Sequence, residues 1–218
     1  PALRGSGDLP TSTFFNLRPE KQERLLTAAA REFAAQPFHE ASINSMIRAA
    51  GIPRGSFYMY FRDKEDLFRY LVQESIQELL VVFEEILRGR NGDVFAALPD
   101  MYDYLRSHPA ADCGLGGPCM MSAIVNRNGG LQKGGLLEFV EPELILERME
   151  DCVNPDLLDL REPEDLGYIL RTLIILAVPV MYNGLRPGAD PDGRKRLEHV
   201  LQIVRRGMGA KPASAQQK

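Results

Sequence analysis

The stretch SINSMIRAAGIPRGSFYMYFRDKEDL, residues 42–67, contains the clearest structural signals in this chain of 218 residues. It begins with Ser42, a residue type that often caps helix N-termini. Four apolar residues follow at the spacing of one helix face, namely Ile43, Met46, Ile47 and Ala50. Gly51 comes next, where many helices end on a left-handed residue. The stretch therefore predicts a short helix that ends in a tight turn.

Further helices are predicted on both sides of this turn. A second short helix covers about residues 53–60, and Asp63 can cap a long helix that ends near Gly89. Ahead of residue 42, a helix starts at Pro19 and ends at residues 36–37. Its apolar face consists of Leu25, Leu26, Ala29 and Phe33. Two short helices joined by a glycine-containing turn, with a third helix ahead of them, form the layout of a helix-turn-helix.

The rest of the chain also has helical periodicity, and no segment alternates convincingly as a strand does. Predicted helices cover residues 93–107, 118–126, 136–153, 164–183 and 194–208, with a break or kink at Pro142. The fold class is therefore all-α, with eight or nine helices. Residues 173–178 are apolar on every side, so we expect them to be buried all round. A central core helix or an interface with a second copy would satisfy this, and we favour the interface.

Charge is distributed unevenly along the chain. Residues 1–70 carry ten Lys and Arg against eight Asp and Glu, whereas the remainder carries 16 against 22. The net charge of the whole chain is −4. A slightly basic head on an acidic body fits a small module that contacts nucleic acid, although chance would explain the same distribution about equally well.

The three cysteines, Cys113, Cys119 and Cys152, are too few and too scattered for a disulfide framework, which favours a reducing compartment. No signal peptide is recognisable, and the longest apolar run is far shorter than a bilayer requires. We therefore expect a cytoplasmic protein without membrane contact. No residue grouping predicts a metal or another cofactor.

The stretch at residues 42–67 resembles the DNA-binding signature of the TetR/AcrR family of transcriptional regulators. The matching residues are in register without a gap: Ala50-Gly51-Ile52, Gly55-Ser56-Phe57-Tyr58, Tyr60-Phe61 and Lys64-Glu65-Asp66-Leu67. The resemblance covers about residues 14–70. Pro53 departs from it, since the family usually has Ser or Thr there, and Ile47 stands where the family commonly has Ala. Both departures weaken any inference about the DNA sequence that is read.

The resemblance implies a three-helix, homeodomain-like helix-turn-helix whose exposed helix enters the major groove of double-stranded DNA. By the same resemblance, Tyr58, Tyr60 and Lys64 contact backbone phosphates, and Ser42 adds a contact. Base reading falls to Arg54, Asn44 and Ser56, and Gly55 permits close backbone approach. The plainer alternatives are that the tyrosines are core aromatics and that Arg54 is merely solvated. Phe57, Phe61 and Leu67 are assigned to the core, from which Phe57 could reach a thymine methyl.

For the second half, the resemblance implies a helical domain that binds a small-molecule effector and forms a homodimer. The predicted boundaries are a flexible leader at 1–13, the helix-turn-helix at 14–64, the effector and dimerisation domain at 65–210 and a tail at 211–218. Methionines and aromatic residues suit an adaptable, mostly apolar pocket. The candidates are Phe95, Met101, Tyr102, Leu105, Met120, Met121, Tyr168 and Tyr182. The expected function is repression that a small apolar or amphipathic ligand relieves, releasing a near-palindromic operator.

Three other classes of function are weighed against this one. An enzyme is disfavoured, because no catalytic motif is present and the glycines at 114–117 follow no strand. A redox or metal sensor is a better rival, since Cys113 and Cys119 flank that glycine-rich stretch, but their spacing does not suit zinc. A helical scaffold that does not bind DNA is the third alternative.

Overall fold

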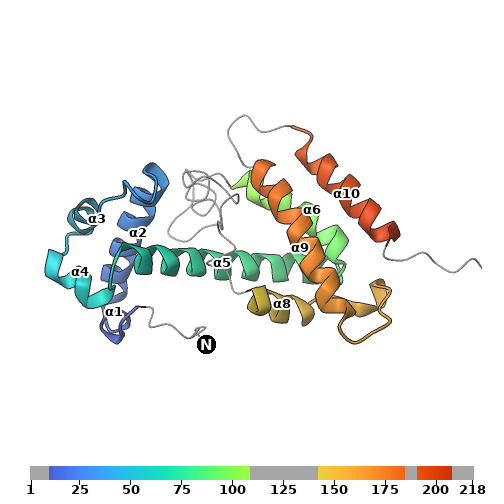
Figure 1. The fold of residues 1–218 in the computed structure, drawn as a ribbon, viewed down its shortest axis with the longest axis horizontal. Helices are drawn as coiled ribbons and strands as arrows, with labels where there is room; N and C mark the ends of the chain where they lie inside the picture. Colours follow the sequence, from blue (N-terminus) through green and yellow to red (C-terminus); the bar gives the residue numbers. More distant parts are fainter. Residues whose placement is uncertain (1–9, 109–141, 185–190, 208–218) are drawn as a thin grey trace, which may run out of the picture. The chain divides into compact units, whose positions relative to one another are not determined.

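The computed structural model describes residues 10–108, 142–184 and 191–207, and every regular element in these ranges is helical (Figure 1). The first five helices are α1 (Ser12–Phe15), α2 (Pro19–Ala35), α3 (Ile43–Ala50), α4 (Arg54–Tyr60) and α5 (Lys64–Gly89). They are followed by α6 (Val94–Ser107), α8 (Pro142–Glu150), the 3-10 turn η3 (Pro155–Leu157), α9 (Asp165–Gly184) and α10 (Gly193–Gly207). The predicted all-α class is confirmed.

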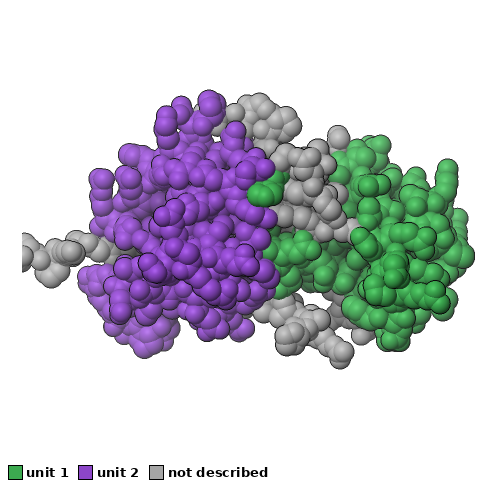
Figure 2. All heavy atoms as spheres, turned by 180° about the vertical axis from the view of Figure 1, so that it is seen from behind, with its two compact units in different colours: residues 1–79, 108–141 green, residues 80–107, 142–218 purple. Residues whose placement is uncertain are grey.

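The chain forms two compact units, coloured separately in Figure 2. Unit 1 comprises residues 1–79 and 108–141, and unit 2 comprises residues 80–107 and 142–218. Helix α5 is continuous through the predicted boundary at residues 64–65 and passes from unit 1 into unit 2. That boundary stays a prediction. The predicted tail, and the predicted leader as far as residue 9, lie outside the described residues.

Unit 1 is built on α2, which packs against α3, while α1 and α3 both pack against α4 (Figure 1). Its core consists of apolar side chains from these helices, from the residue after α4 and from the start of α5, including Phe14, Leu25, Phe33, Met46, Phe57, Phe61 and Leu67. The rings of Phe14 and Phe61 lie 5.0 Å apart, and the ring of Phe68 meets that of Phe33 edge-on at 4.9 Å. Aromatic burial of this kind contributes more stability per residue than aliphatic burial does.

Unit 2 is built on α9, which packs against α6, α8 and α10, with α6 also contacting α10. Tyr102 of α6 is fully buried beneath the end of α9 and the start of α10. A Cβ atom at Gly184 or Gly193 would lie far inside contact distance of the Tyr102 hydroxyl. The two glycines therefore make room for this tyrosine. Arg106 of α6 also joins the end of α9, because its guanidinium donates to the Gly184 carbonyl at 3.4 Å.

Most predicted helix limits agree with the structure to within one or two residues, because they rest on end signals. The Ser42 hydroxyl accepts from the Ser45 amide, and Gly51 is left-handed with φ 67° and ψ 37°. Asp63 accepts from the Asp66 amide at 2.8 Å and so caps α5. The helix predicted at 118–126 and the first part of that at 136–153 lie outside the described residues.

The alternative that the apolar run at residues 173–178 belongs to a central core helix is wrong. Leu173 and Ala177 are buried, but Ile175 leaves 67% of its surface exposed, so α9 is not a central core helix.

In the part of the chain that the structure describes, no helix combines the length and hydropathy that a membrane span would need.

Candidate nucleic-acid interface

Helices α3 and α4 and the turn between them form the most distinctive surface of unit 1. Ser42 holds the start of α3 in two ways: its hydroxyl caps the helix, and its amide donates to the Glu32 carboxylate of α2 at 2.9 Å. At the other end of α3, Gly51 and Ile52 donate to the carbonyls of Arg48 and Ile47. The tight turn at this end of α3 sets the direction of the chain toward α4, which begins after Pro53.

Helix α4 has one buried and one exposed face. Phe57 is fully buried and anchors the helix to the core of unit 1. On the opposite side, Arg54, Gly55, Tyr58 and Met59 are exposed, with 50% of Tyr58 and 58% of Met59 accessible. The Arg54 guanidinium, the Tyr58 hydroxyl and an exposed glycine backbone suit contacts with phosphates and base edges. The alternative that Tyr58 is a core aromatic is wrong. The suggestion that Phe57 could reach a thymine methyl is also wrong, because its side chain is fully buried.

The other predicted contact residues border this face to different extents. Asn44 is exposed on the first turn of α3, while Ser42, Ser56 and Tyr60 are half-buried. The Tyr60 ring lies 6.3 Å from that of Phe14, so this tyrosine also belongs to the edge of the core. The structure thus brings seven of the eight predicted residues onto α3, its cap and α4.

Lys64, the eighth, is tied into the fold. Its Nζ donates to the carbonyls of His39 and Ala41 at 3.3 and 2.9 Å, and it lies 4.8 Å from the centre of the Phe38 ring. These contacts join the first turn of α5 to the loop between α2 and α3. An ammonium group has three hydrogens, so one more acceptor can still be bound.

Met59 is a candidate contact that the sequence reasoning missed. It lies one turn beyond Gly55 and beside Tyr58, so the helical spacing alone placed it on the exposed face. An exposed thioether is a flexible apolar group that can cover a thymine methyl.

The predicted effector residues are only partly brought together. Phe95, Met101 and Tyr102 are buried on α6 and Leu105 is half-buried there, whereas Tyr168 lies on α9 with 68% of its surface exposed. Tyr182 lies in α9, but its side chain is outside what the structure describes. Met120 and Met121 lie outside the described residues, as do Cys113 and Cys119. Cys152 is half-buried, with Arg88 at 3.9 Å from its sulfur.

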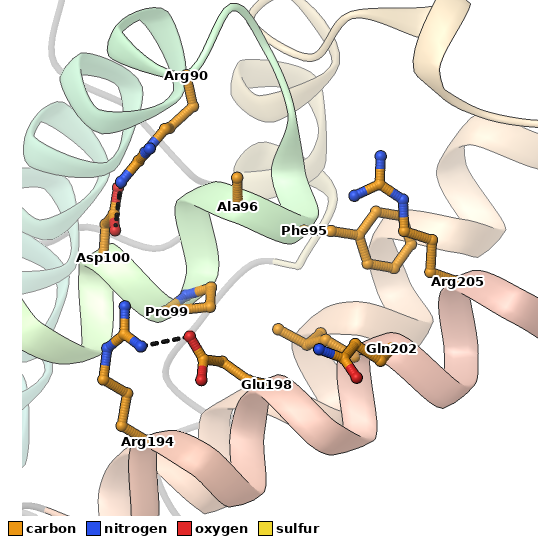
Figure 3. A pocket seen from close by; sticks show the side chains of 10 residues that line it. Arg90, Phe95, Ala96, Pro99, Asp100, Arg194, Glu198, Gln202 and Arg205 are labelled. Atoms are coloured by element: carbon orange, nitrogen blue, oxygen red, sulfur yellow. Dashed lines mark hydrogen bonds and ion pairs between the residues drawn. The ribbon is translucent and has the colours of Figure 1, made fainter.

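Phe95 borders a groove of about 280 Å³ between α6 and α10 (Figure 3). Three arginines line it, and each is paired with a carboxylate: Arg90 with Asp100, Arg194 with Glu198, and Arg205 with Asp93. The Arg205 guanidinium also lies 5.2 Å from the centre of the Phe95 ring. The groove is therefore lined by charged side chains that form ion pairs with one another or with a neighbouring carboxylate. It differs from the mostly apolar cavity expected for the effector.

The chain is similar to known proteins along most of its length. Residues 25–71 match the family model described as bacterial regulatory proteins, tetR family. The chain is 34% identical over 185 residues to the HTH-type transcriptional repressor Rv1474c of Mycobacterium tuberculosis, a match covering 84% of this chain and 90% of that protein. It is 37% identical over 68 residues to the regulator YdgC of Bacillus subtilis, but spans only 35% of that protein's length.

Among solved structures, a tetR-family transcriptional regulator from Streptomyces coelicolor has the same fold, with a TM-score of 0.56 and 22% identity. That alignment covers 88% of this chain and 85% of the other. The helix-turn-helix, the matched family model and the mycobacterial relative together identify a DNA-binding transcriptional regulator. The chain belongs to the TetR family.

Proposed function

We propose that the exposed face of α4 is the surface through which this regulator reads its operator. The observation that carries the proposal is the two-sided character of α4, with Phe57 fully buried and Arg54, Gly55, Tyr58 and Met59 exposed. A helix anchored by one aromatic ring keeps its other face rigid, which contacts in the major groove require. Tyr58, Tyr60, Ser42 and Lys64 would contact phosphates. Arg54, Asn44, Ser56 and Met59 would contact bases, with Gly55 allowing close approach.

Replacement of Arg54 tests this assignment. A labelled duplex is first selected from a random-sequence pool by the wild-type protein, and its affinity is then measured by fluorescence anisotropy. Loss of a bidentate contact to guanine costs roughly tenfold to a hundredfold in affinity for the matched base. R54A should therefore lose about that factor on the selected duplex and much less on unrelated DNA.

Two further variants complete the test. Y58F should weaken binding to both duplexes by a similar factor, because a phosphate contact carries no sequence information. R31A replaces an exposed arginine of α2 outside the proposed surface and should leave both affinities unchanged. Equal affinities of R54A and wild-type protein for the selected duplex would refute the assignment.

The proposed active form is a homodimer assembled through α9 and α10. Support comes from apolar side chains that one chain leaves uncovered, since Tyr168 and Ile175 are about two-thirds exposed on α9 and Ile203 is 56% exposed on α10. Thr172 and Pro179 extend the same face of α9 at helical spacing. A two-fold pair of such chains would present two copies of α4 to a near-palindromic operator.

We further propose that the protein acts as a repressor and that a small apolar or amphipathic ligand in unit 2 releases the operator. The buried methionine and aromatic side chains of α6 are the described part of the candidate pocket. A ligand releases DNA only if it binds a second conformation more tightly than the DNA-bound one. Native mass spectrometry of the purified protein tests for a captured ligand, and its addition to the protein–duplex complex should lower the anisotropy.

A further inference from the structure

Helix α4 ends after only seven residues, and its last carbonyls are bound from a distant part of the chain. A helix leaves its last four carbonyls without partners inside the helix. In α4 the Phe57 carbonyl accepts from the Phe61 amide at 2.9 Å, within the local chain. The carbonyls of Met59 and Tyr60 instead accept from Thr11, which lies 48 residues away from Met59.

Thr11 makes both of these bonds. Its hydroxyl donates to the Met59 carbonyl at 2.5 Å, and its amide donates to the Tyr60 carbonyl at 3.0 Å. Thr11 is also the N-cap residue of α1, where a threonine hydroxyl normally accepts from its own helix. Here the side chain makes no such cap bond. The hydroxyl is committed to the end of α4.

Helix α1 is itself fastened to α2, so the contact with α4 has a firm support. The Gln22 side-chain amide of α2 lies 3.1, 3.2 and 3.1 Å from the carbonyls of Phe14, Phe15 and Leu17, and its two hydrogens are shared among them. The Phe14 ring is fully buried against Phe61, directly after α4. The end of α4 is thus connected to α2 through Gln22, α1 and Thr11.

We infer that Thr11 is a positioning residue for DNA recognition, which acts by fixing the C-terminal turn of α4. This inference rests on the proposed phosphate contacts of Tyr58 and Tyr60, since both tyrosines belong to that turn. Thr11 binds the carbonyl of Met59, which lies between the two tyrosines, and the carbonyl of Tyr60. A rigid support reduces the conformational freedom that α4 would otherwise lose on binding.

The test compares T11V, which removes the hydroxyl and keeps the shape, with T11S, which keeps the hydroxyl. Affinity is measured on the duplex selected by the wild-type protein, and amide hydrogen exchange of α4 is measured in the free protein. We expect T11V to bind roughly twofold to tenfold more weakly, because a less restrained α4 has to be ordered on binding, and to exchange faster across residues 54–60. T11S should stay within about twofold of wild type in both measurements.

T13V is the matched control. Thr13 is an exposed threonine of the same helix, and no hydrogen bond of its side chain is found among the described residues. T13V should change neither affinity nor exchange. A second variant, Q22M, removes the donor that holds α1 and should reproduce the faster exchange of α4.

A double-mutant cycle separates positioning from direct contact. If Thr11 acts through the tyrosines, T11V should cost less in Y58F than in wild-type protein. Wild-type affinity and exchange in T11V would overturn the inference. So would weaker binding that is fully additive with Y58F and leaves α4 exchange unchanged, because Thr11 would then contact DNA itself. If the wild-type protein selects no duplex, the proposed contacts fail, while the exchange measurement still decides for or against the support of α4 by Thr11.

Discussion

Gly51 is the residue on which the direction of α4 most depends. Its φ of 67° lies in the left-handed region, where a side chain costs roughly 1–2 kcal/mol. A Cβ atom there would meet nothing within 4 Å, so the cost is conformational rather than steric. We therefore expect G51A to lower the free energy of unfolding by about 1 kcal/mol in urea titrations, and G51N to lower it less. A G51A protein as stable as wild type would contradict this account.

Gly55, four residues later, should respond in the opposite direction. It is the second residue of α4 and has no positive φ, and a Cβ atom there would also meet nothing within 4 Å of the free protein. Alanine is favoured over glycine by roughly 0.5–1 kcal/mol in a helix interior and by less in the first turn, so G55A should be the slightly more stable protein in the same titrations.

The same G55A variant should bind the selected duplex more weakly, because the added methyl group occupies the face that is proposed to approach DNA. The free energy of unfolding would then rise while the affinity for DNA falls. Opposite changes of this kind would indicate that Gly55 serves DNA binding rather than folding. G55A with unchanged affinity would mean that the backbone at residue 55 stays away from the duplex.

Single residues also differ in how far the sequence predicts their contacts. Ser42, Gly51 and Asp63 were predictable because each acts within four residues of itself. Thr11 was not, since its hydroxyl binds a carbonyl 48 positions away and its sequence context is only that of an ordinary N-cap. Lys64 matches the family pattern, yet its bonds to the His39 and Ala41 carbonyls depend on the path of a loop.

At the scale of a helix, α5 contains a row of ionisable groups whose titration is coupled to folding. Glu74 lies four residues from both Tyr70 and Glu78. Desolvation raises the pKa of Glu74, although the hydrogen bond with Tyr70 opposes this shift. Desolvation, followed by repulsion from Glu74, also raises the pKa of Glu78. The folded chain therefore binds these protons more tightly than the unfolded chain does.

The sign of the resulting pH dependence follows from linkage. A raised pKa in the folded state gives stability that is fully present below the unfolded pKa of about 4.3 and is lost as pH rises through the folded value. Replacement of Glu74 by neutral Gln should therefore raise the unfolding temperature at about pH 7 and leave it unchanged at about pH 3.5. E85Q, at an exposed position of the same helix, is the control and should show no such difference. A gain in E74Q that is equal at both pH values would exclude titration as its cause.

Among whole elements, the helices that were easiest to predict have an end signal in the sequence. Helix α2 starts at Pro19 and α6 follows Asp93, whose carboxylate accepts from the amides of Phe95 and Ala96. The pairing of those helices was not predictable in the same way. As an aromatic residue, Phe95 suits an apolar effector pocket. In the structure, however, Arg205 of α10 lies over its ring, and the groove that it borders is lined by charged residues.

At the scale of the whole molecule, the apolar run at residues 173–178 gives the most informative difference between sequence and structure. Its hydropathy indicates burial on all sides, yet one chain covers only the side that faces α6, α8 and α10. The hydropathy of a residue reflects its burial in the functional assembly. The structure of one chain shows only the burial that folding produces. The uncovered residues therefore point to a surface that association would cover.

A charge on this surface should separate assembly from folding. Ile175 is 67% exposed, so an arginine there can extend into solvent and the single chain should keep its stability. In a dimer through α9 and α10, the same guanidinium would be buried without a partner, which is strongly unfavourable. Light scattering should give twice the chain mass of 24.4 kDa for the wild-type protein and a single chain mass for I175R. Because a monomer binds each half-site independently, I175R should also lose affinity for the selected duplex while its α4 remains intact. L157R, which charges an exposed leucine of η3 outside the sequences of both helices, should remain dimeric. An I175R protein that is still a dimer would place the interface elsewhere.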